Sequence, residues 1–198
     1  HRRQRQMCIR DRSTSWIPIV IEEGKDTEYL AFEKNWMSIN EALIDAGYRT
    51  GWSVWKRTPK EGDDGWAQYY VVVGNNDEKS LSQNEWPSFM QKALGKSQRV
   101  ISKMMDGSGI ISEARTLQLS WVGGTVYAGE SIKPGDKMYF HYMTKKNDDF
   151  ENLELNVWKP IAEEQIVDGI RKFWGLAEVT SKSENFPGDA TDVAFYIK

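Results

Sequence analysis

The chain has 198 residues, of which 39% are hydrophobic and 28% are charged, and it carries a formal net charge of −3. This composition is typical of a globular protein and excludes a disordered, collagen-like or membrane-spanning chain, because no apolar run approaches the roughly 18 residues of a membrane helix. With roughly 150 residues per domain as a prior, we expect one or two domains that fold without disulfides or metals.

Residues 1–12 (HRRQRQMCIRDR) differ from the rest of the chain. They hold five arginines, one of the two histidines and the only cysteine, Cys8. The string resembles translated sequencing-adaptor read-through, so we interpret it as a non-native basic segment of a gene fragment. The alternative is a basic arm that binds nucleic acid or an anionic membrane.

Without residues 1–12, 21 basic and 28 acidic residues remain. The resulting net charge of −7 disfavours nucleic-acid binding. The rest of the chain also lacks any thiol for catalysis, zinc binding or disulfides.

Residues 13–122 predict an N-terminal repeat that begins with the order strand, helix, strand, strand. Apolar residues at helical spacing predict a helix over 25–46, and Gly47 follows as its natural C-terminal stop. The β-rich runs predict strands at 16–22, 51–58 and 66–73. The turn-forming connector 59–65 predicts that the last two strands form a hairpin.

The N-terminal repeat continues with a second helix and a fourth strand. Ser82 and Glu85 fit a capping box at the start of a helix predicted over 85–105, with Pro87 in its first turn. A glycine-containing break at 106–109 precedes a strand predicted at 114–121. The resulting βαββαβ order is that of the ferredoxin-like fold.

A linker over 123–135 leads to a C-terminal repeat at 136–198. Strands are predicted at 136–144, 171–180 and 189–198, with a helix at 150–168 in which Pro160 should start a new turn or produce a kink. This repeat contains no second helix or fourth strand, so we interpret it as an incomplete ferredoxin-like unit.

Residues 36–52 and 158–174 are similar to each other, which is the basis for two repeats. Seven of seventeen positions are identical, where chance gives about one. The identical pairs are Trp36/Trp158, Ile39/Ile161, Glu41/Glu163, Ile44/Ile166, Gly47/Gly169, Arg49/Arg171 and Trp52/Trp174. Upstream, Tyr29 and Glu33 align with Phe150 and Glu154 if the second copy has one inserted residue.

Both faces of the predicted strands are apolar. In 51–58, Trp52 and Val54 alternate with Trp55, and in 136–144, Tyr139 and His141 alternate with apolar neighbours. Helices of a split βαβ unit cover one face only, so the other face needs a second layer. We therefore predict an α+β fold in which tandem ferredoxin-like units pack sheet to sheet as an intramolecular α/β barrel.

The pattern Tyr29-x3-Glu33-x2-Trp36, followed by Gly47, Arg49 and Trp52, resembles the dimeric α/β-barrel superfamily. The closest resemblance is to bacterial proteins that carry a pattern like Y-x3-E-x2-3-W-K-P-x-H, of which the second copy has Trp158-Lys159-Pro160. The final histidine of that pattern is Asn40 or Ala162 here. The resemblance implies a dimeric α/β-barrel fold. Members of this superfamily include cofactor-independent monooxygenases, haem degraders, isomerases and binding proteins, so it indicates no single function.

His141 is the only histidine outside residues 1–12 and is the candidate catalytic residue, as a general acid or base or as a haem ligand. The alternative is a partly buried strand histidine with a structural role.

Trp55, Arg57 and Tyr69 are not repeated, so we assign them to a ligand pocket with Tyr139 and His141. The repeated tryptophans are interpreted as fold anchors. Glu41 and Arg49, with their repeat partners, suggest a structural ion pair or cap.

The resulting functional hypothesis is a small organic ligand bound in an α/β-barrel cavity. Its enzymatic form is turnover of that ligand as by a cofactor-independent monooxygenase. We expect no cofactor, metal, nucleic-acid or membrane partner, while self-association through sheet faces is compatible with the apolar strands. The alternative is a non-catalytic structural or oligomerisation module. An RNA-binding tandem domain is disfavoured by the acidic charge and the missing RNP1 pattern. Whether the protein is an enzyme, and in which compartment it works, stay open.

Overall fold

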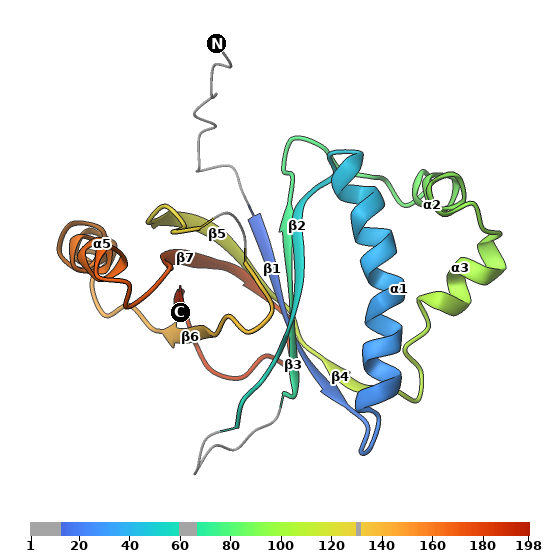
Figure 1. Ribbon diagram of the computed structural model, residues 1–198, viewed down its shortest axis with the longest axis horizontal. Helices are drawn as coiled ribbons and strands as arrows, with labels where there is room; N and C mark the ends of the chain where they lie inside the picture. Colours follow the sequence, from blue (N-terminus) through green and yellow to red (C-terminus); the bar gives the residue numbers. More distant parts are fainter. Residues whose placement is uncertain (1–12, 60–66, 130–131) are drawn as a thin grey trace. The chain divides into compact units, whose positions relative to one another are not determined.

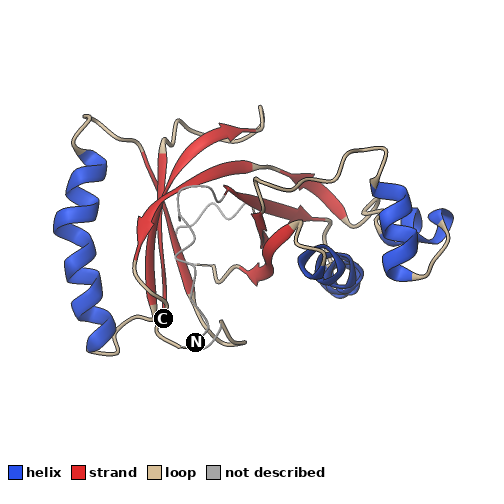
Figure 2. Cartoon of the chain, turned by 90° about the horizontal axis from the view of Figure 1, so that it is seen from above, coloured by secondary structure: helices blue, strands red, loops and turns tan. Residues whose placement is uncertain are grey.

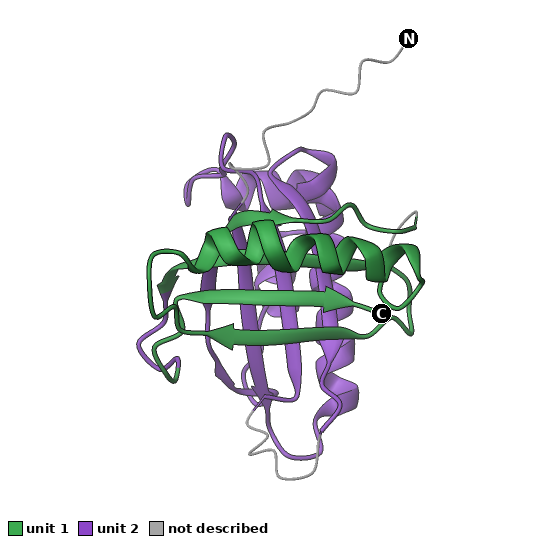
Figure 3. Cartoon of the chain, turned by 90° about the vertical axis from the view of Figure 1, so that its left-hand side faces the viewer, with its two compact units in different colours: residues 1–11, 119–181, 187–198 green, residues 12–118, 182–186 purple. Residues whose placement is uncertain are grey.

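The computed structural model describes residues 13–59, 67–129 and 132–198, which form an α+β fold (Figure 1). The predicted non-native segment 1–12 and most of the connector 59–65 lie outside these residues. Two compact units are distinguished in Figure 3. Within the described residues, unit 2 comprises 13–118 and 182–186, and unit 1 comprises 119–181 and 187–198. Most of the predicted N-terminal copy, 13–122, lies in unit 2, and most of the predicted C-terminal copy, 136–198, lies in unit 1.

Unit 2 has the strand order of a ferredoxin-like βαββαβ unit. Its strands lie in the order β2-β3-β1-β4, and the pairs β1/β3, β2/β3 and β1/β4 are antiparallel. The predicted hairpin of β2 and β3 is therefore confirmed. The strands are β1 (Ser13–Ile21), β2 (Arg49–Lys56), β3 (Tyr69–Asn75) and β4 (Ile111–Ala114), and the helices are α1 (Asp26–Asp45), α2 (Trp86–Leu94) and α3 (Gln98–Met104).

Helix α1 packs its apolar stripe on the sheet and ends as its sequence predicts. Tyr29 and Phe32 join β-strand residues in one core cluster, and Ile39 and Leu43 join Met90 and Ile101 of α2 and α3 in another. Gly47 takes a left-handed φ of 77°, and the Tyr48 amide donates to the Leu43 carbonyl over 2.8 Å. This arrangement closes the helix because glycine has no steric penalty in that conformation.

Two predicted elements of unit 2 are each divided in the structure. The helix expected over 85–105 is two helices, because Gly95 adopts a left-handed φ of 62° and ends α2. The predicted capping box is present, with mutual hydrogen bonds between Ser82 and Glu85, although the helix itself starts at Trp86. The strand expected over 114–121 is divided into β4 and β5 (Leu117–Gly124), so the predicted linker 123–135 begins within β5.

Unit 1 contains most of β5 and the strands β6 (Met138–Met143), β7 (Phe173–Lys182) and β8 (Asp192–Ile197), in the order β5-β7-β8-β6. One helical stretch covers a face of this sheet; it consists of α4 (Phe150–Leu153), the π-helix η2 (Glu154–Trp158) and α5 (Lys159–Val167). The irregularity predicted at Pro160 is a π-turn just before it, and Pro160 occupies the first turn of α5. Trp174, Leu176 and Ala162 form the centre of the core.

Candidate functional site

A pocket of about 260 Å³ lies between α1 and the sheet of unit 2; we call it the helix–sheet pocket. Its walls are mostly aliphatic and aromatic, and three polar side chains face into it. The lining residues are Ile17, Ile19, Phe32, Glu33, Trp36, Asn40, Arg49, Trp52, Val71, Val73 and Ile111. A largely apolar hollow with a few polar groups is the usual form of a small-molecule site.

Helical and strand periodicities explain why these residues converge. Glu33, Trp36 and Asn40 follow Tyr29 at steps of four, three and four residues, which places them on one side of α1. Across the pocket, Trp52 of β2 pairs in register with Val73 of β3. Strand alternation then directs both side chains to the face that α1 covers.

Glu33 is the buried acid of the pocket, with only 7% of its surface exposed. Burial raises the pKa of its carboxyl group, and the neighbouring Tyr29 hydroxyl lowers it in part. Burial also raises the pKa of Tyr29, which is fully enclosed. A carboxyl group in such surroundings can donate a proton to a ligand oxygen or, once ionised, accept one from a ligand.

Asn40 and Arg49 form a hydrogen-bonded chain at the other end of the pocket. The Arg49 guanidinium donates to Asn40 Oδ1, and Asn40 Nδ2 donates to the Trp36 carbonyl over 2.7 Å. Burial lowers the pKa of Arg49. The sequence suggested Glu41 as the partner of Arg49, but Glu41 is exposed and its repeat counterpart Glu163 pairs instead with Lys159. An amide thus orients the guanidinium, which leaves its charge available for an anionic or carbonyl oxygen.

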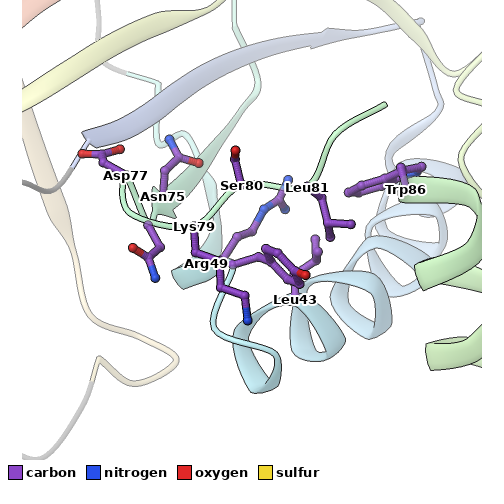
Figure 4. A pocket seen from close by; sticks show the side chains of 10 residues that line it. Leu43, Arg49, Asn75, Asp77, Lys79, Ser80, Leu81 and Trp86 are labelled. Atoms are coloured by element: carbon purple, nitrogen blue, oxygen red, sulfur yellow. The ribbon is translucent and has the colours of Figure 1, made fainter. Parts of the chain in front are cut away.

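A second hollow of about 380 Å³, the loop pocket, lies beside the first and also has Arg49 in its lining (Figure 4). Its other polar groups already serve the fold. Lys79 Nζ donates to the Ala46 carbonyl over 2.5 Å, and Asn76 Nδ2 donates to the Gly47 carbonyl over 2.7 Å. Both bonds tie the loop after β3 to the C-terminal end of α1, so we assign the loop pocket a mainly structural role.

The structure separates the three unit 2 residues that were predicted to bind a ligand. Tyr69 lies on the α1 side of the sheet, where its hydroxyl donates to Asp26 over 2.7 Å and its ring packs on Tyr29 with centroids 4.5 Å apart. Trp55 and Arg57 lie on the opposite face, because Trp55 alternates with Trp52 and Val54. Trp55 Nε1 donates to Ser53, and Arg57 NH1 donates to the Ala67 carbonyl.

Tyr139 and His141 share one face of β6 in unit 1. Both stack on Tyr196 of β8, with ring centroids 4.7 Å and 5.7 Å away, and Tyr196 packs against the core beneath the helical stretch. His141 therefore lies on the helix side of the sheet, and it is exposed because β6 ends the strand order of this unit. The sequence suggested the side opposite the helix. Neither residue lines the helix–sheet pocket or the loop pocket.

The pocket residues that sequence reasoning passed over are those of the resemblance pattern itself. Recurrence in the second copy favours anchoring roles for Trp36 and Trp52 and an ion pair or cap for Arg49, while Glu33 has no role assigned from the sequence beyond its place in the pattern. Asn40 occupies the position of the pattern's histidine. A polar residue on the buried stripe of a helix was the available signal, since buried polar groups need partners or a function.

Within the residues the structure describes, no group of three or more His, Cys, Asp or Glu side chains is arranged to bind a metal ion. No helix in the same residues is long and apolar enough to cross a membrane.

No protein-family model and no curated protein matches the sequence. Among solved structures, a proposed monooxygenase from Fusobacterium nucleatum is similar with 13% identity and a TM-score of 0.49, over 94% of this chain and 75% of that one. An anthrone oxidase-like protein is similar with 11% identity and a TM-score of 0.49, over 95% and 73%. A proposed chlorite dismutase has 15% identity and a TM-score of 0.40, over 93% and 78%. Similarities of this extent support no conclusion about function.

Proposed function

We propose that the protein binds a small, largely apolar organic molecule in the helix–sheet pocket of unit 2. The observation that carries the proposal is a buried acid, Glu33, and a guanidinium oriented by Asn40, that of Arg49, which both face a largely apolar hollow. Apolar walls provide affinity, and a few placed polar groups fix the orientation of a ligand. This location differs from the barrel cavity that the sequence suggested.

The dimensions of the pocket indicate a compact ligand. Drug-sized molecules occupy pockets of roughly 300–1,000 Å³, and this pocket has about 260 Å³. Trp36 and Trp52 offer flat surfaces for an aromatic ring, and Arg49 can pair with an acidic or carbonyl oxygen. The proposed ligand class is therefore a fused or single-ring aromatic compound that bears such an oxygen.

An enzymatic form of the proposal gives Glu33 the role of proton donor or acceptor for the bound molecule. Burial raises the pKa of Glu33 above its ordinary value, and a carboxyl group held beside a bound molecule can act as a general acid or base. In this form an aromatic substrate held by Trp36 and Trp52 would lose a proton to the Glu33 carboxylate. Binding alone is the simpler form, and both forms use the same residues.

We also infer that residues 13–122 and 136–198 are copies of one ferredoxin-like unit, joined by a linker at 123–135, and that their sheets pack together as an α/β barrel. Two features support the duplication. The strand orders β2-β3-β1 and β7-β8-β6 correspond, and Gly169 ends α5 with a φ of 72° as Gly47 ends α1. Self-association through sheet faces belongs to the same proposal.

The binding proposal is tested with two probes, 2-naphthoate and its neutral analogue 2-naphthylmethanol, by ligand-observed NMR titration. We expect both to bind. Val71→Phe fills the pocket and should abolish binding of both, whereas Met37→Phe, on the exposed side of α1, should change neither. Arg49→Gln should weaken naphthoate at least tenfold and the alcohol little, because only the carboxylate pairs with the guanidinium.

Unchanged binding in Val71→Phe and Arg49→Gln, with all variants folded by circular dichroism, would refute the site. Loss of binding in His141→Ala instead would move the site to His141 and Tyr139 on β6. Failure of every probe to bind, together with a large stability loss in Arg49→Gln, would favour the structural alternative.

A further inference from the structure

The helical stretch of unit 1 carries a stripe of exposed apolar side chains. Leu153, Val157, Trp158 and Ile161 are exposed on it, and Ile170 continues the stripe just beyond its C-terminal end. A contiguous apolar patch on a helix is unusual for a protein surface and commonly marks an interaction site. We call these five residues the helix stripe.

Members of the helix stripe correspond to residues that are covered in unit 2. In the repeat alignment, Ile161 corresponds to Ile39, and their exposed fractions are 39% and 0%. Leu153 corresponds to buried Phe32, Trp158 to Trp36 and Ile170 to Tyr48. The two helices therefore present similar faces, and only one of these faces is covered.

In unit 2 the cover is the segment that contains α2, α3 and the turn after them. Ile39 packs with Met90 and Ile101, Tyr48 meets Phe89 edge-on at 5.3 Å, and Phe32 lies against the backbone at Gly107. In Figure 2, α1 is seen end-on with α2 and α3 beside it, whereas the helical stretch of unit 1 has no helix on its outer side.

The charges on the covering segment and on the helical stretch of unit 1 are also complementary. The covering segment carries four exposed cations, Lys92, Lys96, Arg99 and Lys103. Exposed acids lie beside the stripe in unit 1, because Glu164 and Asp168 follow Ile161 at steps of three and seven residues. An apolar helix face with basic flanks would thus meet an apolar stripe with acidic flanks, which favours association and its correct register.

We propose that the helix stripe of unit 1 is a docking surface for a basic amphipathic helical segment of a partner, similar in chemistry to α2–α3. Such a partner would place large apolar side chains at i and i+4 against Trp158 and Ile161, with lysine or arginine toward the acids. The inference goes beyond the proposed ligand site; it rests on the repeat alignment and does not require the pocket to bind a ligand.

The experiment uses the full chain and a fluorescently labelled peptide of residues 82–111, with fluorescence anisotropy as the readout. The peptide should bind saturably, and 0.5 M salt should weaken it, because charge contributes to docking. Ile161→Glu should reduce affinity at least tenfold. Val167→Glu is the matched control, since Val167 is 87% exposed on the same helix but corresponds to exposed Asp45 and lies off the stripe; its affinity should not change.

The Ile161→Glu variant also distinguishes docking on unit 1 from displacement of α2–α3 in unit 2, because only the former involves Ile161. A scrambled peptide of the same composition should not bind. The proposal would be overturned by absence of saturable binding, by equal affinity of the wild type and Ile161→Glu, or by self-association of the chain that Ile161→Glu abolishes while the peptide has no effect. Circular dichroism of both variants confirms that they fold.

Discussion

One amide explains why two equivalent arginines have different surroundings. Arg49 donates to Asn40, whereas for Arg171, which aligns with Arg49, the residue that aligns with Asn40 is Ala162. Arg171 is buried, its Nε and NH1 atoms have no hydrogen-bond partner within the described residues, and its guanidinium lies 4.6 Å from the Tyr196 ring centroid. Aromatic stacking thus replaces the hydrogen bond in unit 1 at some energetic cost.

Removal of the amide at position 40 and its introduction at position 162 should change the free energy of unfolding in opposite directions. Asn40→Ala leaves the buried Arg49 guanidinium without its acceptor and should destabilise the protein by roughly 1–3 kcal/mol. Ala162→Asn offers Arg171 an acceptor and should stabilise by about 1 kcal/mol. Urea denaturation of both variants checks the pair; a destabilised Ala162→Asn would show that this site has no room for the amide.

Glu33 should make stability depend on pH in a defined direction. Burial raises its folded-state pKa above the ordinary value of 4.5, so the folded protein holds this proton more firmly than the unfolded chain does. The resulting stability is fully present below the ordinary pKa and is lost as pH rises through the raised one. Glu33→Gln, which stays neutral, should therefore gain in melting temperature relative to wild type between pH 4 and pH 7. A constant difference across that range would contradict the assignment.

At the scale of elements, the π-turn explains how an extra residue is accommodated. The repeat alignment needs one inserted residue between Glu154 and Trp158, and η2 spans Glu154–Trp158. A π-turn holds one more residue than an α-turn, so the residues before and after it remain on the same helix face. Leu155 at this turn lies close against Gly123 of β5, where a β-carbon would come within 2.5 Å of it.

Deletion of one residue should consequently be tolerated in one helix and not in the other. Removal of exposed Asn156 should convert η2 to a regular turn and reduce the melting temperature only slightly. Removal of exposed Met37 from α1 should rotate half of a regular helix by about 100° and disrupt the core. Thermal melts of the two deletion variants compare them directly, and equal losses would exclude this explanation of the π-turn.

Periodicity and caps predicted most elements, and local breaks account for the differences. The apolar spacing and Gly47 located α1, and the turn-rich connector located the β2–β3 hairpin. The division of the helix at Gly95 was missed because an isolated glycine is tolerated within many helices and only tertiary packing decides whether it takes a left-handed conformation. The interruption between β4 and β5 has no comparable marker in the sequence.

At the scale of the whole molecule, the pocket could be predicted only in part. The resemblance pattern contains Glu33, Trp36, Arg49 and Trp52, but repetition favours an anchoring role, so the sequence points to unrepeated residues such as Trp55 for a pocket. One residue can both anchor the fold and line a pocket, because the helix face that packs on the sheet also borders the hollow beside it. Tyr69 and Trp55 were grouped although strand alternation places them on opposite faces. Three-dimensional packing was needed to find the hollow itself.

The position of Arg49 has a consequence for any compound that enters unit 2. The same guanidinium borders two separate cavities, and it cannot direct its donors fully into both. A molecule that draws it toward one cavity withdraws it from the other. Two compounds could then antagonise each other without overlapping, and by thermodynamic reciprocity each would weaken the other to the same degree.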